Sequence, residues 1–266
     1  MIHPTSPASS LAGRRILVVG AGRAEGARLP ASNGNATCLA LALAGANLVC
    51  ADRDYDAARR TVADIVVAGG RATAVRADVA DTEQIVLMVE QAAAAMNGLD
   101  GLVLNVGISH RVPLSRLDTD GWDAVMNVNA RAHLFCAKYA LPRMPAGGSI
   151  VFVSSTASRR PGGRNPAYEA SKAALSAVCR AVALEGQPGG IRANVVMLGL
   201  IDTPMGRAAT HARPDRLSRP LPFGRQGTAA EVAAAVRFLL SDEASYINAV
   251  ELPVDGGLCA GIAMHS

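Results

Sequence analysis

The sequence predicts one α/β domain built on a doubly wound parallel sheet, and three observations lead to this fold class. Short apolar runs alternate with segments of helical periodicity along the chain. These runs are continuously apolar, as in strands that are buried on both faces of a sheet. Half of the 266 residues are hydrophobic but only 3% are aromatic, which suits close packing of helices on a sheet.

Strand-like and helix-like segments follow one another in turn, which implies right-handed crossovers between parallel strands. The apolar runs are the predicted strands: Arg15–Gly20, Asn47–Asp52, Ala72–Ala77, Gly101–Asn105, Ser149–Ser154, Ile191–Met197 and Val250–Val254. The stretches between them are the predicted helices: Ala36–Ala44, Tyr55–Ala68, Thr82–Met96, Thr119–Pro142, Ala167–Glu185 and Ala229–Leu240. Two segments are expected to be irregular, Ala21–Asn33 and the proline-containing Gly199–Gly227.

A single domain accounts for nearly the whole chain. Residues 1–13 are predicted to be an N-terminal tail and residues 14–266 one domain, because no internal repeat and no linker divides the chain. The formal net charge is +4, and the arginines are scattered singly or in pairs. Without dense basic blocks, we expect no nucleic-acid partner.

Cysteine usage and hydropathy favour a cytoplasmic protein. The five cysteines are far apart and form no CxxC pair, as expected of free thiols in a reducing compartment. The N-terminus lacks the apolar core of a signal peptide. The longest apolar stretch, Cys38–Ala51, is too short to span a membrane. We therefore expect no membrane attachment.

The first strand leads into a glycine-rich turn. Gly20-Ala21-Gly22 follows the strand, and a second glycine signal, Asn33-Gly34, opens the next helix. Such a turn lets the backbone approach a pyrophosphate, and the free N–H groups of a helix N-terminus can bind it. Gly20, Asn33 and Gly34 are therefore candidate dinucleotide-binding residues, although this stretched pattern also suits an ordinary strand-to-helix loop.

The second strand ends in a carboxylate, Asp52, about 20 residues after the helix begins. A carboxylate here can accept hydrogen bonds from the adenosine ribose and would repel a 2′-phosphate, which predicts NAD over NADP. Two alternatives stay open. Asp52 could instead cap the helix that starts near Asp54, and the neighbouring Arg53 would favour NADP.

The strongest signal is Ser155 followed by Tyr168 and Lys172. The Tyr and the Lys are four residues apart on a predicted helix, and hence on one face, and the serine follows the preceding strand. Lys172 is one of only two lysines, Lys138 being the other, in a chain whose basic residues are nearly all arginine. A compact ammonium close to a phenol favours the phenolate, as general acid/base catalysis requires.

With the C-terminal VDGG, this constellation makes the chain resemble the classical short-chain dehydrogenases/reductases over about residues 14–261. The resemblance implies a Rossmann-type fold and hydride transfer between a nicotinamide cofactor and a secondary alcohol or ketone. It implies that Tyr168 is the general acid/base, that Lys172 lowers its pKa and binds the nicotinamide ribose, and that Ser155 binds the substrate oxygen. Asn129 is similar to the asparagine that holds a water in the family's proton relay.

The resemblance also implies the rest of the cofactor site. Its members are the adenine contacts Asp78 and Val79, the turn residues Asn105 and Gly107, and the carboxamide contacts Ile201 and Thr203. The chain departs from the family pattern at Val19, Leu104 and Leu198, which replace a threonine, an asparagine and a proline. None of these changes removes a catalytic group.

Two other functions stay open. One is a 3-oxoacyl-thioester reductase, which typically takes NADP and is opposed by Asp52; the other is a non-catalytic dinucleotide-binding protein of the same fold. The sequence lacks the GxSxG and HExxH patterns of hydrolases, and we expect no metal site. The resemblance further implies a homotetramer, whose contacts would use Leu134, Phe135, Ala173, Ala174, Ala177 and Val178.

An insertion, Arg23–Ser32, stands where the cofactor phosphates are expected. It is either a solvated loop, since loops tolerate insertions at small entropic cost, or a flap in which Arg23 or Arg28 meets phosphate charge. The segment Met205–Leu221 is predicted to cover the substrate.

Overall fold

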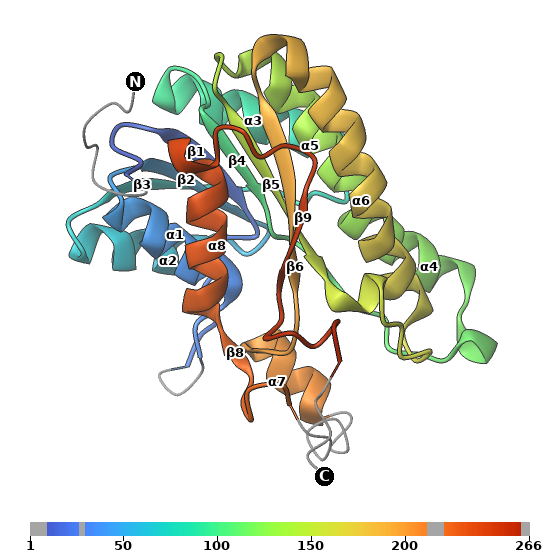
Figure 1. The fold of residues 1–266 in the computed structure, drawn as a ribbon. Coiled ribbons are helices and arrows are strands. Elements are labelled where there is room, and N and C mark those ends of the chain that lie inside the picture. Colours follow the sequence, from blue (N-terminus) through green and yellow to red (C-terminus); the bar gives the residue numbers. More distant parts are fainter. Residues whose placement is uncertain (1–9, 27–29, 212–220, 262–266) are drawn as a thin grey trace.

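The computed structural model describes residues 10–26, 30–211 and 221–261, and its helices cover both faces of one sheet (Figure 1). Seven parallel strands pair in the order β3-β2-β1-β4-β5-β6-β9. Their bounds are β1 Arg15–Val19, β2 Asn47–Asp52, β3 Arg71–Arg76, β4 Gly101–Leu104, β5 Ser149–Ser155, β6 Arg192–Leu198 and β9 Glu251–Val254. The predicted fold class is confirmed.

Two hydrophobic cores lie on the two faces of the sheet, because alternate residues of each strand point to opposite faces. Ile16 and Val18 pack with α1 (Asn33–Leu43), α2 (Tyr55–Val67) and α8 (Ala229–Leu240). Leu17 and Phe152 pack with α3 (Thr82–Met96), α5 (Ala132–Ala140) and α6 (Pro166–Gly186) on the other face. The described helices include none that is long and apolar enough to cross a membrane, and all five cysteines are free thiols.

The helix predicted over Thr119–Pro142 is not continuous. It consists of α4 (Thr119–Met126), a π-helical turn over Asn127–Arg131, α5 and a short 3-10 turn over Leu141–Arg143. The π turn centres on Asn129, whose side chain is hydrogen-bonded outside the helix. Single-turn π segments inside helices are frequent at functional sites.

The segment predicted to be irregular, Gly199–Gly227, is partly ordered. A two-stranded parallel ladder pairs β7 (Ile201–Asp202) with β8 (Gly227–Thr228), and α7 spans Pro204–His211. Pro204 opens α7, a position where the missing N–H of proline costs no helical hydrogen bond. The prediction treated proline as a breaker, whereas here it begins a helix. Much of the proposed substrate-covering segment, residues 212–220, lies outside the described residues.

The sheet changes winding direction between β1 and β4, which are neighbours although two other strands separate them in sequence. Ligands of such sheets bind beyond the carboxyl ends of the strands at this switch point. Here the end of β4 is joined to the end of β1 by a hydrogen bond of 2.7 Å from Asn105 Nδ2 to the Gly20 carbonyl. Gly20 and Asn105, two of the predicted cofactor residues, thus lie at the expected edge of the sheet.

Candidate active site

The turn after β1 needs glycine because the backbone of two other segments presses against it. Gly20 has a φ of +81°, and a Cβ there would lie 2.7 Å from the Val106 amide nitrogen. A Cβ on Gly34 would lie only 2.0 Å from the Gly20 carbonyl oxygen. The first turn of α1 is therefore packed directly on the glycine turn, as the predicted phosphate site requires.

The N-terminus of α1 is open to an anion. Ser32 caps the helix, and its Oγ accepts a hydrogen bond from the Asn35 amide at 3.2 Å. The amides of Asn33 and Gly34 have no hydrogen-bond acceptor among the described residues. Free N–H groups at the positive end of a helix bind phosphate, so this site fits the pyrophosphate of a dinucleotide.

Asp52 joins the end of β2 to the glycine turn. Its Oδ2 accepts from the Gly22 amide at 2.9 Å and its Oδ1 from the Asp54 amide at 3.1 Å. An ionised carboxylate accepts about four hydrogen bonds, so these two leave room for the hydroxyls of a ribose. Helix α2 is capped by Asp54 itself, whose side chain accepts from the Ala57 amide, and Asp52 is therefore not its cap.

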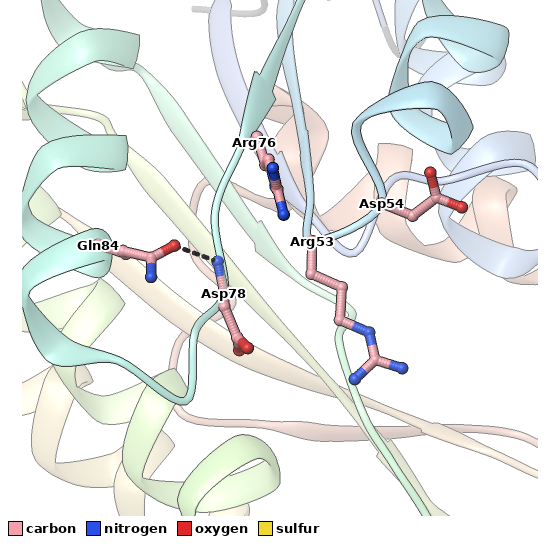
Figure 2. A pocket seen from close by; sticks show the side chains of 5 residues that line it. All are labelled: Arg53, Asp54, Arg76, Asp78 and Gln84. Carbon is pink, nitrogen blue, oxygen red and sulfur yellow. Dashed lines mark hydrogen bonds between the residues drawn. The ribbon is translucent and has the colours of Figure 1, made fainter.

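A pocket of about 620 Å³ lies beyond the ends of β2 and β3 (Figure 2). Its lining residues are Arg53, Asp54, Arg76, Asp78 and Gln84. Asp78 is held by its amide, which donates to Gln84 Oε1, and by its Oδ1, which accepts from the Ala80 amide. This pocket places the predicted adenine contact Asp78 near Arg53, where the base and ribose of a dinucleotide would meet both charges.

Lys172 is buried at the centre of the site. Its Nζ donates to the Val153 carbonyl at 2.9 Å and lies 5.8 Å from the centre of the Tyr168 ring. Burial lowers the pKa of Lys172 to about 8, because an ammonium loses hydration in the protein interior. The predicted pair on one face of α6 is thus brought together, with the tyrosine on the more exposed side.

The end of β5 is bonded to α6. Ser154 Oγ donates to the Lys172 carbonyl at 2.9 Å, and the next residue, Ser155, is the last of the strand. The Ser155 hydroxyl accepts from the Ala157 amide at 3.2 Å. This connection ties the end of β5, where Ser155 lies, to the segment of α6 that carries Lys172.

Asn129 joins the π turn to the loop after β4. Its Oδ1 accepts from the Ile108 amide at 2.8 Å, and its Nδ2 donates to the Ile108 carbonyl at 2.9 Å and to Ser171 Oγ at 3.0 Å. A Cβ on Gly107 would lie 3.3 Å from Lys172 Nζ and 3.4 Å from Asn129 Oδ1. Asn129, Lys172 and Gly107, which were all predicted to be site residues, therefore lie close together.

His133 belongs to this site, and sequence reasoning missed it. The side chain is fully buried, its Nε2 lies 3.0 Å from the Val106 carbonyl oxygen, and Nδ1 has no hydrogen-bond partner in the described structure. Burial and, secondarily, the charge of Lys172 lower the pKa of His133 to about 3. Its position four residues after Asn129 on a predicted helix was the available signal.

The segment after β6 carries the last two predicted cofactor residues. The Gly199 amide donates to the Val254 carbonyl at 3.0 Å, which ties this segment to the C-terminal VDGG. Ile201 and Thr203 are both buried. Thr203 Oγ1 accepts from the Gly206 amide at 3.1 Å, so its hydroxyl also stabilises the first turn of α7.

The two ends of the insertion are joined, and Arg23 at its start contacts α2. Ser32 Oγ donates to the Gly22 carbonyl at 2.7 Å, which joins the two ends of the insertion. Arg23 lies 2.9 Å from Asp64 of α2, and its carbonyl accepts from Arg60 Nε at 3.0 Å. Arg23 thus pairs with a carboxylate of α2, whereas Arg28 lies outside the described residues.

Comparison with known proteins agrees with this geometry. A family model described as enoyl-(acyl carrier protein) reductase matches residues 26–259. A 2,5-dichloro-2,5-cyclohexadiene-1,4-diol dehydrogenase of Sphingobium indicum is 33% identical and covers 96% of this chain and 100% of its own length. A cis-4-hydroxycyclohexanecarboxylate dehydrogenase of Sinomonas cyclohexanicum is 36% identical over 85% of this chain and 92% of its own.

A solved structure extends the likeness to three dimensions. A short-chain dehydrogenase from Burkholderia cenocepacia J2315 in complex with NADP superposes with a TM-score of 0.85 at 35% identity. The match covers 92% of this chain and 98% of that protein. The same fold therefore extends over nearly the full length of both chains.

Proposed function

Because this chain belongs to the classical short-chain dehydrogenase/reductase family and is an NAD(P)-dependent oxidoreductase acting on CH–OH groups, we propose that it uses NAD to interconvert a cyclic secondary alcohol and its ketone. The observation that carries the proposal is the burial of Lys172 beside Tyr168. A buried ammonium stabilises a phenolate at its side, which is the base that alcohol oxidation needs.

The chain's own residues would hold the cofactor along the edge of the sheet. The amides of Asn33 and Gly34 would bind the pyrophosphate, Asp52 the adenosine ribose, and Lys172 the nicotinamide ribose. Asp78, Val79, Asn105, Gly107, Ile201 and Thr203 would complete the site. A bound nicotinamide supplies the hydride chemistry, and the protein supplies position and charge.

Tyr168 would move the proton. In alcohol oxidation the Tyr168 phenolate accepts the hydroxyl proton as the carbon gives up its hydride, and in ketone reduction the phenol returns it. The Ser155 hydroxyl would donate to the substrate oxygen and hold it near the tyrosine. Asn129 shapes the loop after β4 and the π turn beside Lys172. A water held there would return the proton to Tyr168.

The choice of NAD rests on Asp52. Its carboxylate at the end of β2 favours ribose hydroxyls and repels a 2′-phosphate. Arg53 and Arg76 line the pocket beyond the ends of β2 and β3 and would attract that phosphate, and NADP is bound by the structural relative from Burkholderia cenocepacia. Both cofactors therefore belong in the test.

The substrate class rests on the relatives, which are named for ring alcohols: a cyclohexadiene diol and a hydroxycyclohexanecarboxylate. A 3-oxoacyl-thioester reductase is the alternative, because a 3-oxoacyl-[acyl-carrier-protein] reductase of Thermotoga maritima is 36% identical over 85% of this chain. Such reductases typically take NADP, so Asp52 opposes this alternative.

A screen of secondary alcohols against NAD and NADP in parallel tests the proposal. We expect turnover of cyclic alcohols with NAD, read as NADH absorbance. Cofactor binding without turnover on a broad panel, including 3-oxoacyl thioesters with NADPH, would instead support a non-catalytic dinucleotide-binding protein.

We also propose that the enzyme is a cytoplasmic homotetramer. Free cysteines suit a reducing compartment. Leu134 of α5 and Ala173 and Ala177 of α6 are exposed, and α5 and α6 pack side by side. Apolar residues exposed on two neighbouring helices are suited to a contact between subunits.

A further inference from the structure

Four consecutive residues after β4, Asn105–Ile108, are each held by a different part of the molecule. Asn105 is bonded to Gly20, and Ile108 is bonded to Asn129 on both its amide and its carbonyl. Gly107 packs against Lys172. The carbonyl of Val106 is held by His133. The loop Asn105–Ile108 therefore lies between the glycine turn and the buried lysine, and His133 fixes one of its four residues.

Filling this space with the imidazole of His133 costs free energy of folding. Its bond to a carbonyl oxygen requires that Nε2 carry the proton, so Nδ1 is left as a buried acceptor without a partner in the described structure. A buried unpaired acceptor costs about 1–3 kcal/mol, which an apolar side chain of the same size would avoid. The neighbouring Phe152, whose ring lies 6.3 Å away, shows that apolar packing is available here.

We propose that His133 is a positioning residue: the N–H at Nε2 holds the Val106 carbonyl and so keeps the loop Asn105–Ile108 in the conformation that accepts the cofactor. This inference rests on the proposed function, in which Asn105 and Gly107 line the nicotinamide cofactor. His133 touches neither substrate nor cofactor and acts through the loop. Protonation of its Nδ1 would place a second cation beside Lys172, and the buried site therefore keeps the imidazole neutral.

Two amide variants of His133 test the role of the Nε2 proton. His133→Gln can place an N–H near the position of Nε2, whereas His133→Asn carries the same amide one methylene short. We expect the Kd for NADH, measured by fluorescence titration at pH 7.5, to rise about tenfold in H133N, the equivalent of one lost hydrogen bond. H133Q should stay within about threefold of the wild type, and the KM for the alcohol should change little in either.

Cys136→Ala is the matched control. It removes a buried side chain three residues further along α5 that packs in the core behind the sheet. It should lower Tm without changing the NADH Kd, which separates positioning from general destabilisation. Wild-type NADH affinity in folded H133N, equal weakening in H133Q and H133N, or weakening in C136A would each overturn the inference.

The binding measurement also separates this inference from the proposed function. NADH titration requires no turnover, so wild-type protein that binds NADH but oxidises no alcohol contradicts the proposed function and leaves the comparison of variants intact. If H133N does not fold, NADH affinity of H133Q decides: the proposal requires it to be close to that of the wild type, and a tenfold loss overturns it.

Discussion

Lys172 is the residue around which the catalytic centre is arranged. It is buried, it lies beside the Tyr168 ring, and the loop after β4 and the π turn both reach it. An ammonium favours the phenolate form of a phenol beside it, because opposite charges attract. The chemistry of the site therefore depends on two side chains that the chain places one helical turn apart.

Tyr168→Phe tests the general acid/base. The variant keeps the ring that lies over Lys172 but removes the hydroxyl that exchanges the proton. We expect kcat to fall at least about 10²-fold while Tm and the NADH Kd stay close to wild type. Steady-state kinetics with a titrated cofactor measure both. A variant with nearly wild-type kcat would exclude Tyr168 from this role.

Asp52→Asn tests the choice of cofactor. Asparagine keeps the size of the side chain and one carbonyl acceptor for the Gly22 amide but removes the negative charge. We expect the preference for NAD over NADP, measured as a ratio of kcat/KM values, to shrink about tenfold, since hydrogen bonds to a charged group are the stronger ones. A wild-type enzyme that prefers NADP would contradict the ribose role and point to Arg53.

Because His133 is buried, we predict that the folded protein loses stability in acid. Its pKa is about 3 in the folded protein against an ordinary 6.5, so the unfolded chain binds a proton that the folded chain refuses. The contribution of the neutral imidazole is complete above about pH 6.5 and declines as the pH falls toward 3. Between pH 6.5 and 5 we expect the unfolding free energy of the wild type to drop about 2 kcal/mol more than that of H133N. Urea unfolding at both pH values measures this, and identical pH dependence would show that His133 titrates normally.

At the scale of elements, the loops around the sheet edge differ in what holds them. The loop Asn105–Ile108 is bonded at several residues, and the insertion is closed at its base by Ser32 and the Gly22 carbonyl. The π turn between α4 and α5 is likewise held by other segments, because the Asn129 side chain is hydrogen-bonded to Ile108 and Ser171. Contacts between segments, rather than helical propensity, determine these shapes.

Arg23→Ala tests whether the insertion acts on the cofactor. Because Arg23 pairs with Asp64 while both side chains are about one third exposed, we expect a loss of at most about 1 kcal/mol in unfolding free energy. The NAD Kd, measured by calorimetric titration, should not change. Weaker NAD binding would mean that Arg23 leaves Asp64 to meet the phosphates, as a flap would require.

At the scale of the whole molecule, the exposed apolar residues of α5 and α6 predict assembly. Light scattering at micromolar concentration should give the mass of a tetramer. Leu134→Glu, at a position 39% exposed in the single chain, should lower that mass, since it places a charge in the contact. Leu87→Glu, on α3 and 54% exposed, is the matched control and should not. A monomeric wild type would rule out the tetramer.

The sequence by itself determined the fold class, the order of the strands along the chain and the pairing of Tyr168 with Lys172. These follow from local patterns: apolar runs of strand length, helical periodicity, and two chemical groups separated by one turn of a helix. It also indicated the edge of the sheet where Gly20, Gly34 and Asp52 would lie, because ligands meet doubly wound sheets at the carboxyl ends of their strands.

Only the tertiary structure decided how the catalytic surroundings are held. One continuous helix was expected where the π turn lies, and an irregular segment where α7 lies. The pairing of Arg23 with Asp64 and the place of His133 were missed. Each depends on a contact between segments far apart in the chain, as when His133 meets Val106 across 27 residues. Propensity and periodicity describe neighbours along a chain, whereas a buried hydrogen bond is determined by what the fold brings alongside it.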